Sequence, residues 1–188
     1  MNKHSPIAIE FSRIVAVDRL DQGEVVEAIS AGAQERVALA ARFGLVALDS
    51  LSAQVSLRRI GHGPVVRVEG RLSAEVVQNC VVSLEPVHNW VEEDFVLLYA
   101  PEGSGGGHSH VLEDGLDFKE DDWPEPLEEG RIDSGEAVAQ QLALALDPYP
   151  RKPGVRLEDV IGRRDGVGAK EPPASPFAAL ARLSRRDS

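Results

Sequence analysis

The chain has 188 residues, of which 43% are hydrophobic and 5% aromatic, and its net charge is −11. This length predicts about one domain with a core of its own, filled mainly by valine, leucine and alanine. The excess of acid opposes binding of nucleic acid through the surface as a whole. The single cysteine excludes an internal disulfide. No secretory leader and no apolar run of membrane-spanning length is apparent, so we expect a cytoplasmic protein.

The charge is distributed unevenly along the chain. Residues 91–147 contain 16 acids against only Lys119 and Arg131, a net charge of −14. Residues 148–188 contain nine bases against five acids, a net charge of +4. An acidic middle and a basic tail indicate different partners for the two segments, or an attraction between them.

Strand signals dominate the part of the chain before residue 101. Alternating or continuous apolar residues predict strands over 5–17, 51–59, 65–84 (one long strand or two shorter ones) and 89–101. Short turns between them favour an antiparallel sheet of strands that are neighbours in sequence. The strand at 51–59 should bury one side, consisting of Leu51, Ala53, Val55 and Leu57.

Two longer helices are predicted. One covers 34–43 and should stop at Gly44 in the left-handed conformation. The other covers about 134–146, where Asp133 can cap the first turn and Glu136 completes a capping box. The apolar face expected for the first helix consists of Val37, Ala40 and Ala41.

Composition divides the chain into three parts. Residues 1–150 should form a single domain that includes an acidic, glycine-rich loop at 102–130, which cannot bury enough apolar surface to offset its ordering entropy. Residues 151–174 predict a flexible linker, and residues 175–188 a short amphipathic helix. We therefore expect an α+β fold: a mainly antiparallel, twisted sheet or partly open barrel with two packed helices, the acidic loop and the short C-terminal helix.

Few residues carry recognisable chemistry. Cys80 lies among β-branched residues with no cation nearby in sequence, so a buried apolar role is favoured over a reactive thiol. His108 and His110 could share a metal ion, but a glycine-rich loop holds ligands poorly, and we predict neither a metal nor a cofactor. Carboxylate pairs such as Glu92 and Glu93 are expected on exposed strand, where general acid–base chemistry is disfavoured. An enzyme is not indicated.

Three stretches, in this order, resemble the YceD family. The first, "CVVSLEPV", is similar to the family pattern C-x-R-C-L-x-P-V, although Ser83 replaces the second cysteine. The second, "IDSGEAVAQQLALALDPYP", is similar to an I-D-L opening followed by a helix that ends in L-x-L-P-x-x-P. The third, "SPFAALARL", is similar to the family's N-P-F ending. The matching residues with a structural role are Cys80, Leu84, Pro86, Ile132, Asp133, Pro176, Phe177 and Leu180.

The resemblance implies a non-enzymatic role in ribosome biogenesis and in accumulation of large-subunit ribosomal RNA. We expect the acidic loop, together with a glutamate-rich sheet edge, to bind a basic ribosomal protein or assembly factor. Bulky apolar residues among acids suit such a partner, although a purely solubilising loop is an equal alternative. The candidate interaction residues are Asp114, Asp117, Glu120, Asp121, Asp122, Trp123, Glu128 and Glu129.

Two alternatives stay open at this point. Direct binding of ribosomal RNA would need a local positive patch, for which the candidates are Arg58, Arg59, Arg67 and Arg71. A small metal- or ligand-binding domain would instead use a pocket in the sheet. Because Ser83 replaces the second cysteine of the family pattern, the resemblance implies that Cys80 is the remnant of a pair and has a structural role.

Overall fold

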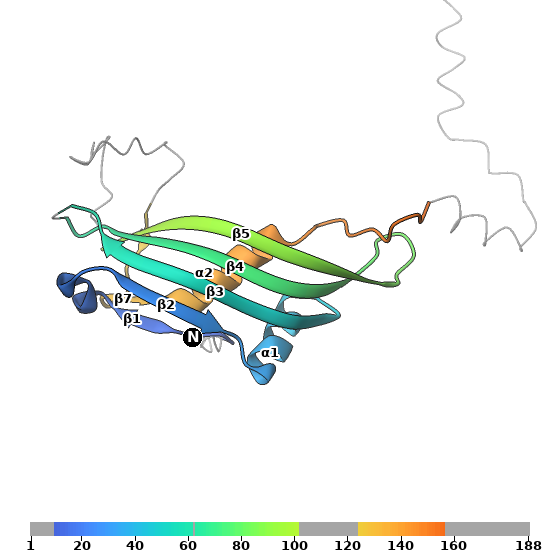
Figure 1. Cartoon of the computed structure of the whole chain (residues 1–188), viewed down its shortest axis with the longest axis horizontal. Helices are drawn as coiled ribbons and strands as arrows, with labels where there is room; N and C mark the ends of the chain where they lie inside the picture. Colours follow the sequence, from blue (N-terminus) through green and yellow to red (C-terminus); the bar gives the residue numbers. More distant parts are fainter. Residues whose placement is uncertain (1–9, 62, 102–123, 157–188) are drawn as a thin grey trace, which may run out of the picture. The chain divides into compact units, whose positions relative to one another are not determined.

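A computed structural model describes residues 10–61, 63–101 and 124–156 (Figure 1). The chain divides into two compact units, Met1–Lys152 and Pro153–Ser188, and all the helices and strands named below belong to the first. The acidic segment up to Trp123, both loop histidines and the expected C-terminal helix lie outside the described residues.

A five-stranded sheet forms the body of the domain. Its order is β2-β3-β4-β5-β6, with antiparallel pairing up to β5 and parallel pairing of β6 on β5. The strands are β2 (Val25–Ser30), β3 (Ala47–Arg59), β4 (Val66–Asn79), β5 (Pro86–Ala100) and β6 (Glu125–Pro126).

The remaining elements complete an α+β fold, as predicted. A two-stranded antiparallel ribbon joins β1 (Ile14–Ala16) to β7 (Arg131–Asp133). A 3₁₀ helix, η1, covers Val17–Gln22, and the two α-helices are α1 (Ala33–Phe43) and α2 (Ser134–Ala145). Among the described strands β2 is not paired with β6, so the sheet stays open and forms no closed barrel.

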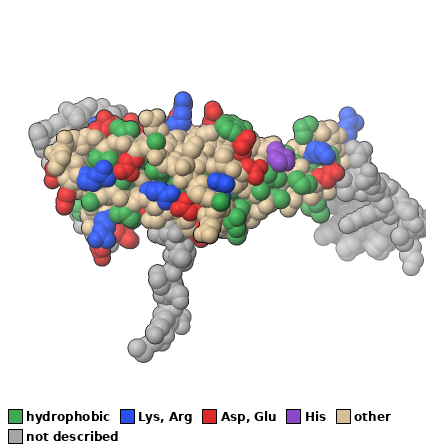
Figure 2. Space-filling model, turned by 60° about the horizontal axis from the view of Figure 1, so that its bottom comes forward, with side chains coloured by type: hydrophobic (Ala, Val, Ile, Leu, Met, Phe, Trp, Pro, Cys, Tyr) green, Lys and Arg blue, Asp and Glu red, His purple; other side chains and the backbone are tan. Residues whose placement is uncertain are grey.

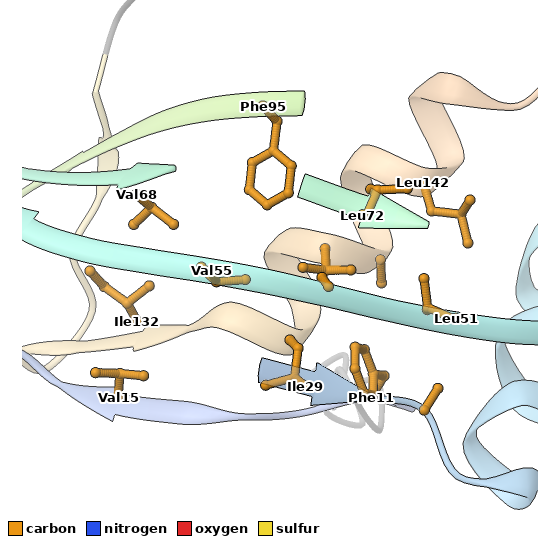
Figure 3. Packing of buried hydrophobic residues seen from close by; sticks show 14 of the residues in the cluster. Phe11, Val15, Ile29, Leu51, Val55, Val68, Leu72, Phe95, Ile132 and Leu142 are labelled. Atoms are coloured by element: carbon orange, nitrogen blue, oxygen red, sulfur yellow. The ribbon is translucent and has the colours of Figure 1, made fainter. Parts of the chain in front are cut away.

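The core lies between one face of the sheet and the layer made by β1, β7 and α2 (Figure 3). The predicted inner side of β3 is confirmed, since every second side chain from Leu51 to Leu57 is buried. The ribbon contributes Val15 and Ile132, and α2 contributes Leu142. No described helix lies on the opposite face of the sheet in Figure 1, and among the described residues this open face carries exposed side chains such as Ser52, Gln54 and Trp90.

Helix α1 has its predicted end, but of its predicted face only Ala40 is buried. Gly44 adopts a φ of 66° and caps the helix as expected. However, Val37 is 73% exposed, whereas Leu39 is fully buried. Both sides of this helix carry aliphatic residues, so the sequence pattern did not determine which side would contact the sheet.

Asp133 caps α2 as predicted, but the second half of the capping box, a hydrogen bond from the Asp133 backbone to the Glu136 side chain, does not form. The Asp133 carboxylate accepts hydrogen bonds from the backbone N–H groups of Gly135 (3.0 Å) and Glu136 (3.1 Å). The Glu136 side chain does not return to Asp133, because it pairs with Arg42 of α1 at 2.7 Å. Helix α2 is therefore attached both to β7 and to the other helix.

Two predicted strands are shorter than expected. In the N-terminal strand only Ile14–Ala16 pairs within the described residues, and Phe11 is buried in the core. The long apolar run forms one strand, β4, that ends at Asn79, so Cys80 begins the following turn instead of continuing the strand.

We expect Asp133→Ala to lower the free energy of unfolding by about 2–4 kcal/mol, because the carboxylate also accepts from Ser12 Oγ (2.6 Å) and Arg13 N–H (2.7 Å). Urea unfolding followed by circular dichroism measures this loss. Asp133→Asn keeps one acceptor and should be intermediate. Asp147→Ala, whose carboxylate accepts one bond from Tyr149 N–H, is the matched control and should cost about 1 kcal/mol or less.

We expect Gly70→Ala to destabilise the domain by about 1–3 kcal/mol, since a Cβ there would lie 2.3 Å from Cζ of Phe95. Ser73→Ala on the same strand should change stability by about 0.5 kcal/mol or less. In a Phe95→Leu background the same glycine substitution should cost less, because the ring it meets is gone. Equal costs in both backgrounds would contradict the clash.

Candidate functional site

The cysteine turn, residues 80–85, joins β4 to β5 and is held by its own backbone. Cys80 N–H donates to the Glu85 carbonyl at 2.8 Å, and Leu84 N–H donates to the Cys80 carbonyl at 2.9 Å. Leu84 has a φ of 61° and is 75% exposed. Val81 N–H donates to the Pro150 carbonyl at 2.9 Å. The turn is thus bonded to the proline segment after α2, which brings two of the quoted motifs together.

The Cys80 thiol lies at the centre of this contact and is fully buried. Its sulfur accepts hydrogen bonds from the backbone N–H groups of Lys152 and Ser83, both at 3.4 Å. These donors, the Lys152 amide first, lower the pKa of the Cys80 thiol from 9.0 to about 6, against the opposing effect of burial. The sequence offers no cation close to Cys80, and the pKa is lowered instead by a backbone donor that lies 72 residues further along the chain.

The four arginines proposed as an RNA patch do not form an unpaired positive surface. Arg58 and Arg67 are cross-strand neighbours on β3 and β4. Arg67, however, pairs with Glu69, and Arg59 pairs with Asp21. Figure 2 shows basic and acidic side chains interspersed on the face that it presents.

Arg71, the fourth of these arginines, binds Asp94 of β5 through two hydrogen bonds. Its Nε and its second guanidinium nitrogen lie 2.6 and 2.7 Å from the two carboxylate oxygens. The guanidinium holds the pKa of Asp94 below its usual value. Three of the four arginines therefore carry a carboxylate partner.

The described end of the acidic segment forms a tight turn. Glu128 and Glu129 are exposed, and Arg131 N–H donates to the Glu128 carbonyl at 2.9 Å. Glu129 and Gly130 both have positive φ, at 49° and 68°. The other candidate interaction residues lie outside the described residues: Asp114, Asp117, Glu120, Asp121, Asp122 and Trp123.

An acidic edge, residues 88–98 of β5, lies at the border of the sheet. Glu92, Glu93 and Asp94 are consecutive and exposed. Trp90 is 58% exposed, and its indole Nε1–H donates to the Glu92 carboxylate at 3.1 Å, which orients the ring beside the acids. A glutamate-rich sheet edge was expected from the sequence, and the strand order puts these acids on β5, at the border of the described sheet.

A shallow open hollow of about 330 Å³ adjoins the acidic edge. It is lined on the β5 side by Trp90, Val91 and Glu93, and on the side of α2 by Ala145 and Asp147. The lining combines acid groups with apolar surface and contains no basic side chain.

Ion pairs that sequence reasoning missed connect the N-terminal segment to the helices. Arg42 pairs with Glu136 and also reaches Glu10 at 3.1 Å, and it lowers the pKa of Glu136. Arg13 binds Glu35 through two hydrogen bonds of 2.8 and 3.0 Å. No local signal could reveal these pairs, because the partners are far apart along the chain.

Within the described ranges, no group of three or more His, Cys, Asp and Glu side chains could hold a metal ion. His108 and His110 lie outside those ranges. None of the described helices is long and apolar enough to cross a membrane.

Comparison with known proteins identified one family. The family model described as "Large ribosomal RNA subunit accumulation protein YceD" matches residues 68–184. The matched region begins in β4 and includes the cysteine turn, the acidic edge and α2. Searches of curated proteins and of solved structures found no match.

We expect Cys80→Ala to destabilise the protein more at pH 9 than at pH 6. A thiol whose folded-state pKa is about 6, below its unfolded value of 9.0, adds stability that is complete above pH 9 and is lost as pH falls toward 6. Chemical unfolding of both proteins across this range measures the difference. Val81→Ala in the same turn removes no titrating group, so its cost should not depend on pH. A pH-independent cost for Cys80→Ala would contradict a thiolate.

Proposed function

Because the chain belongs to the YceD family, whose description is accumulation of the large ribosomal RNA subunit, we propose that it acts in large-subunit biogenesis by binding a basic ribosomal protein or assembly factor. The role is non-enzymatic and cytoplasmic. The observation that supports this partner most directly is the acidic edge, where Glu92 and Glu93 lie exposed beside Trp90.

The chemistry of the acidic edge suits a lysine- and arginine-rich surface. Consecutive carboxylates attract such a surface over about 10 Å at moderate salt, and an exposed indole adds an apolar and cation–π contact. A binder of this kind can shield a basic segment until its RNA site is ready, and salt tunes the strength of the interaction.

The arginines support protein binding over RNA binding. Phosphate contacts need unneutralised Lys or Arg side chains, and Arg59, Arg67 and Arg71 each pair with a carboxylate of this chain. The acids of residues 113–129 remain part of the proposed surface, and the described Glu128 and Glu129 are exposed there.

Affinity purification from native cytosol at low and moderate salt, with and without ribonuclease, tests the proposal. We expect a basic ribosomal protein or assembly factor that survives ribonuclease and is lost as salt rises. A triple variant, Glu92→Gln with Glu93→Gln and Asp94→Asn, should weaken recovery by about tenfold or more, and neutralising the acids of 113–129 should also weaken it.

The matched control neutralises three exposed acids away from the acidic edge: Asp18→Asn, Asp49→Asn and Glu24→Gln. It removes the same charge and should leave recovery nearly unchanged. A ribonuclease-sensitive association with precursor RNA, abolished by replacing Arg58, Arg59, Arg67 and Arg71 with glutamine, would contradict the proposal in favour of direct RNA binding.

A further inference from the structure

The backbone of β5 has a strand partner on only one side over most of its length. On one side β4 pairs with it continuously, from Pro86 to Tyr99. On the other side β6 pairs only with Tyr99 and Ala100. Within the described residues, the stretch from His88 to Leu98 therefore borders the sheet with no strand beside it (Figure 1).

The register determines which backbone groups point away from the sheet. Cys80 N–H donates to the Glu85 carbonyl, so residue 85 faces β4. Hydrogen-bonded pairs alternate along antiparallel strands, and odd-numbered residues of β5 therefore bond to β4 while even-numbered ones point outward. The bond from Leu127 N–H to the Ala100 carbonyl agrees with this alternation. The outward groups thus belong to His88, Trp90, Glu92, Asp94, Val96 and Leu98.

Such an edge is a template for another extended chain, which adds main-chain hydrogen bonds along it. The negative charge of the β5 edge determines which kind of extended chain can bind there. A second copy of this chain would bring Glu92 and Glu93 against their own counterparts, and this repulsion disfavours self-pairing. A basic extended segment would instead place its cations beside these acids.

The surroundings of the edge provide contacts for both sides of an added strand. Alternate side chains of an added strand point to opposite faces of the sheet. On the open face they would meet Trp90 and Glu92. On the other face they would meet the hollow lined by Asn89, Glu93 and Asp147, where polar or basic side chains fit.

We propose that the acidic edge of β5 binds a lysine- and arginine-rich segment of a partner protein as an added β-strand. This inference rests on the proposed function and specifies how the basic partner binds. It needs no change in the sheet, since the outward N–H and carbonyl groups are already aligned.

Amide hydrogen exchange by NMR, on the full chain, tests the mode of binding. The probe is a synthetic peptide of alternating lysine and valine, as long as the acidic edge. In the free protein the even-numbered amides of 88–98 should exchange fast and the odd-numbered ones slowly. With peptide, the even-numbered amides should slow by about tenfold or more, because they gain main-chain partners.

Two methylated forms of the peptide separate strand addition from simple charge attraction. Each carries N-methyl groups on one of the two alternate sets of residues, so that one set of main-chain donors is lost while the charge stays. We expect one form to lose about tenfold or more in affinity and the other to bind nearly as well as the parent. Equal affinities for all three peptides overturn the proposal.

A charge-reversal pair of variants checks the location. Glu93→Lys should weaken peptide binding by about tenfold, whereas Asp49→Lys, with the same change of charge two strands away on β3, should not.

Even-numbered amides that are already protected in the free protein, or that stay unchanged when the peptide binds, overturn the proposal. In that case binding of a basic partner, measured by purification, would still stand as the proposed function. If purification recovers no basic partner at all, both the proposed function and the strand-addition inference are wrong.

Discussion

The carboxylate of Asp133 is the constraint on which the arrangement of the domain depends. It accepts four hydrogen bonds, two from the segment before β1 and two from the start of α2. A single side chain thereby fixes where β7 ends, where the helix begins and where the N-terminal segment crosses. Gly135 shows how close this crossing is, since a Cβ there would lie 2.6 Å from the Phe11 carbonyl oxygen. The layer that covers the sheet is therefore positioned by polar contacts and filled by apolar ones.

A second junction lies at the other end of α2. There the cysteine turn meets the residues that follow the helix, through Val81 and Pro150 and through the Cys80 sulfur. Lys152 adds an ion pair with Glu85 at 3.0 Å. Helix α2 is thus attached at its start to the segment before β1 and at its end to the turn between β4 and β5. This arrangement gives a physical reason why a cysteine turn and a proline segment, far apart in the sequence, belong to one family pattern.

Local patterns in the sequence were sufficient for much of the fold. The inner side of β3 followed from alternation, and the caps Gly44 and Asp133 followed from residue type. The buried side of α1 could not be predicted, because Val37 and Leu39 are both apolar and only packing distinguishes them. The partners of Arg71 and the donors to Cys80 required the strand register and the path of the chain after α2. A glutamate-rich sheet edge was expected, but which residues of the described sheet lack a neighbouring strand depended on the strand order.

The pairing of β1 with β7 has a consequence for synthesis of the chain. Strands β2 to β5 each pair with the next strand along the sequence, so this meander can form as soon as residue 100 has left the ribosome. Val15, by contrast, pairs with Ile132, and the apolar face of the meander is covered only when α2 has followed. A growing chain therefore exposes the core-facing side of this meander until residues 131–145 have been made. During that interval chaperones or an early partner have their best access to it.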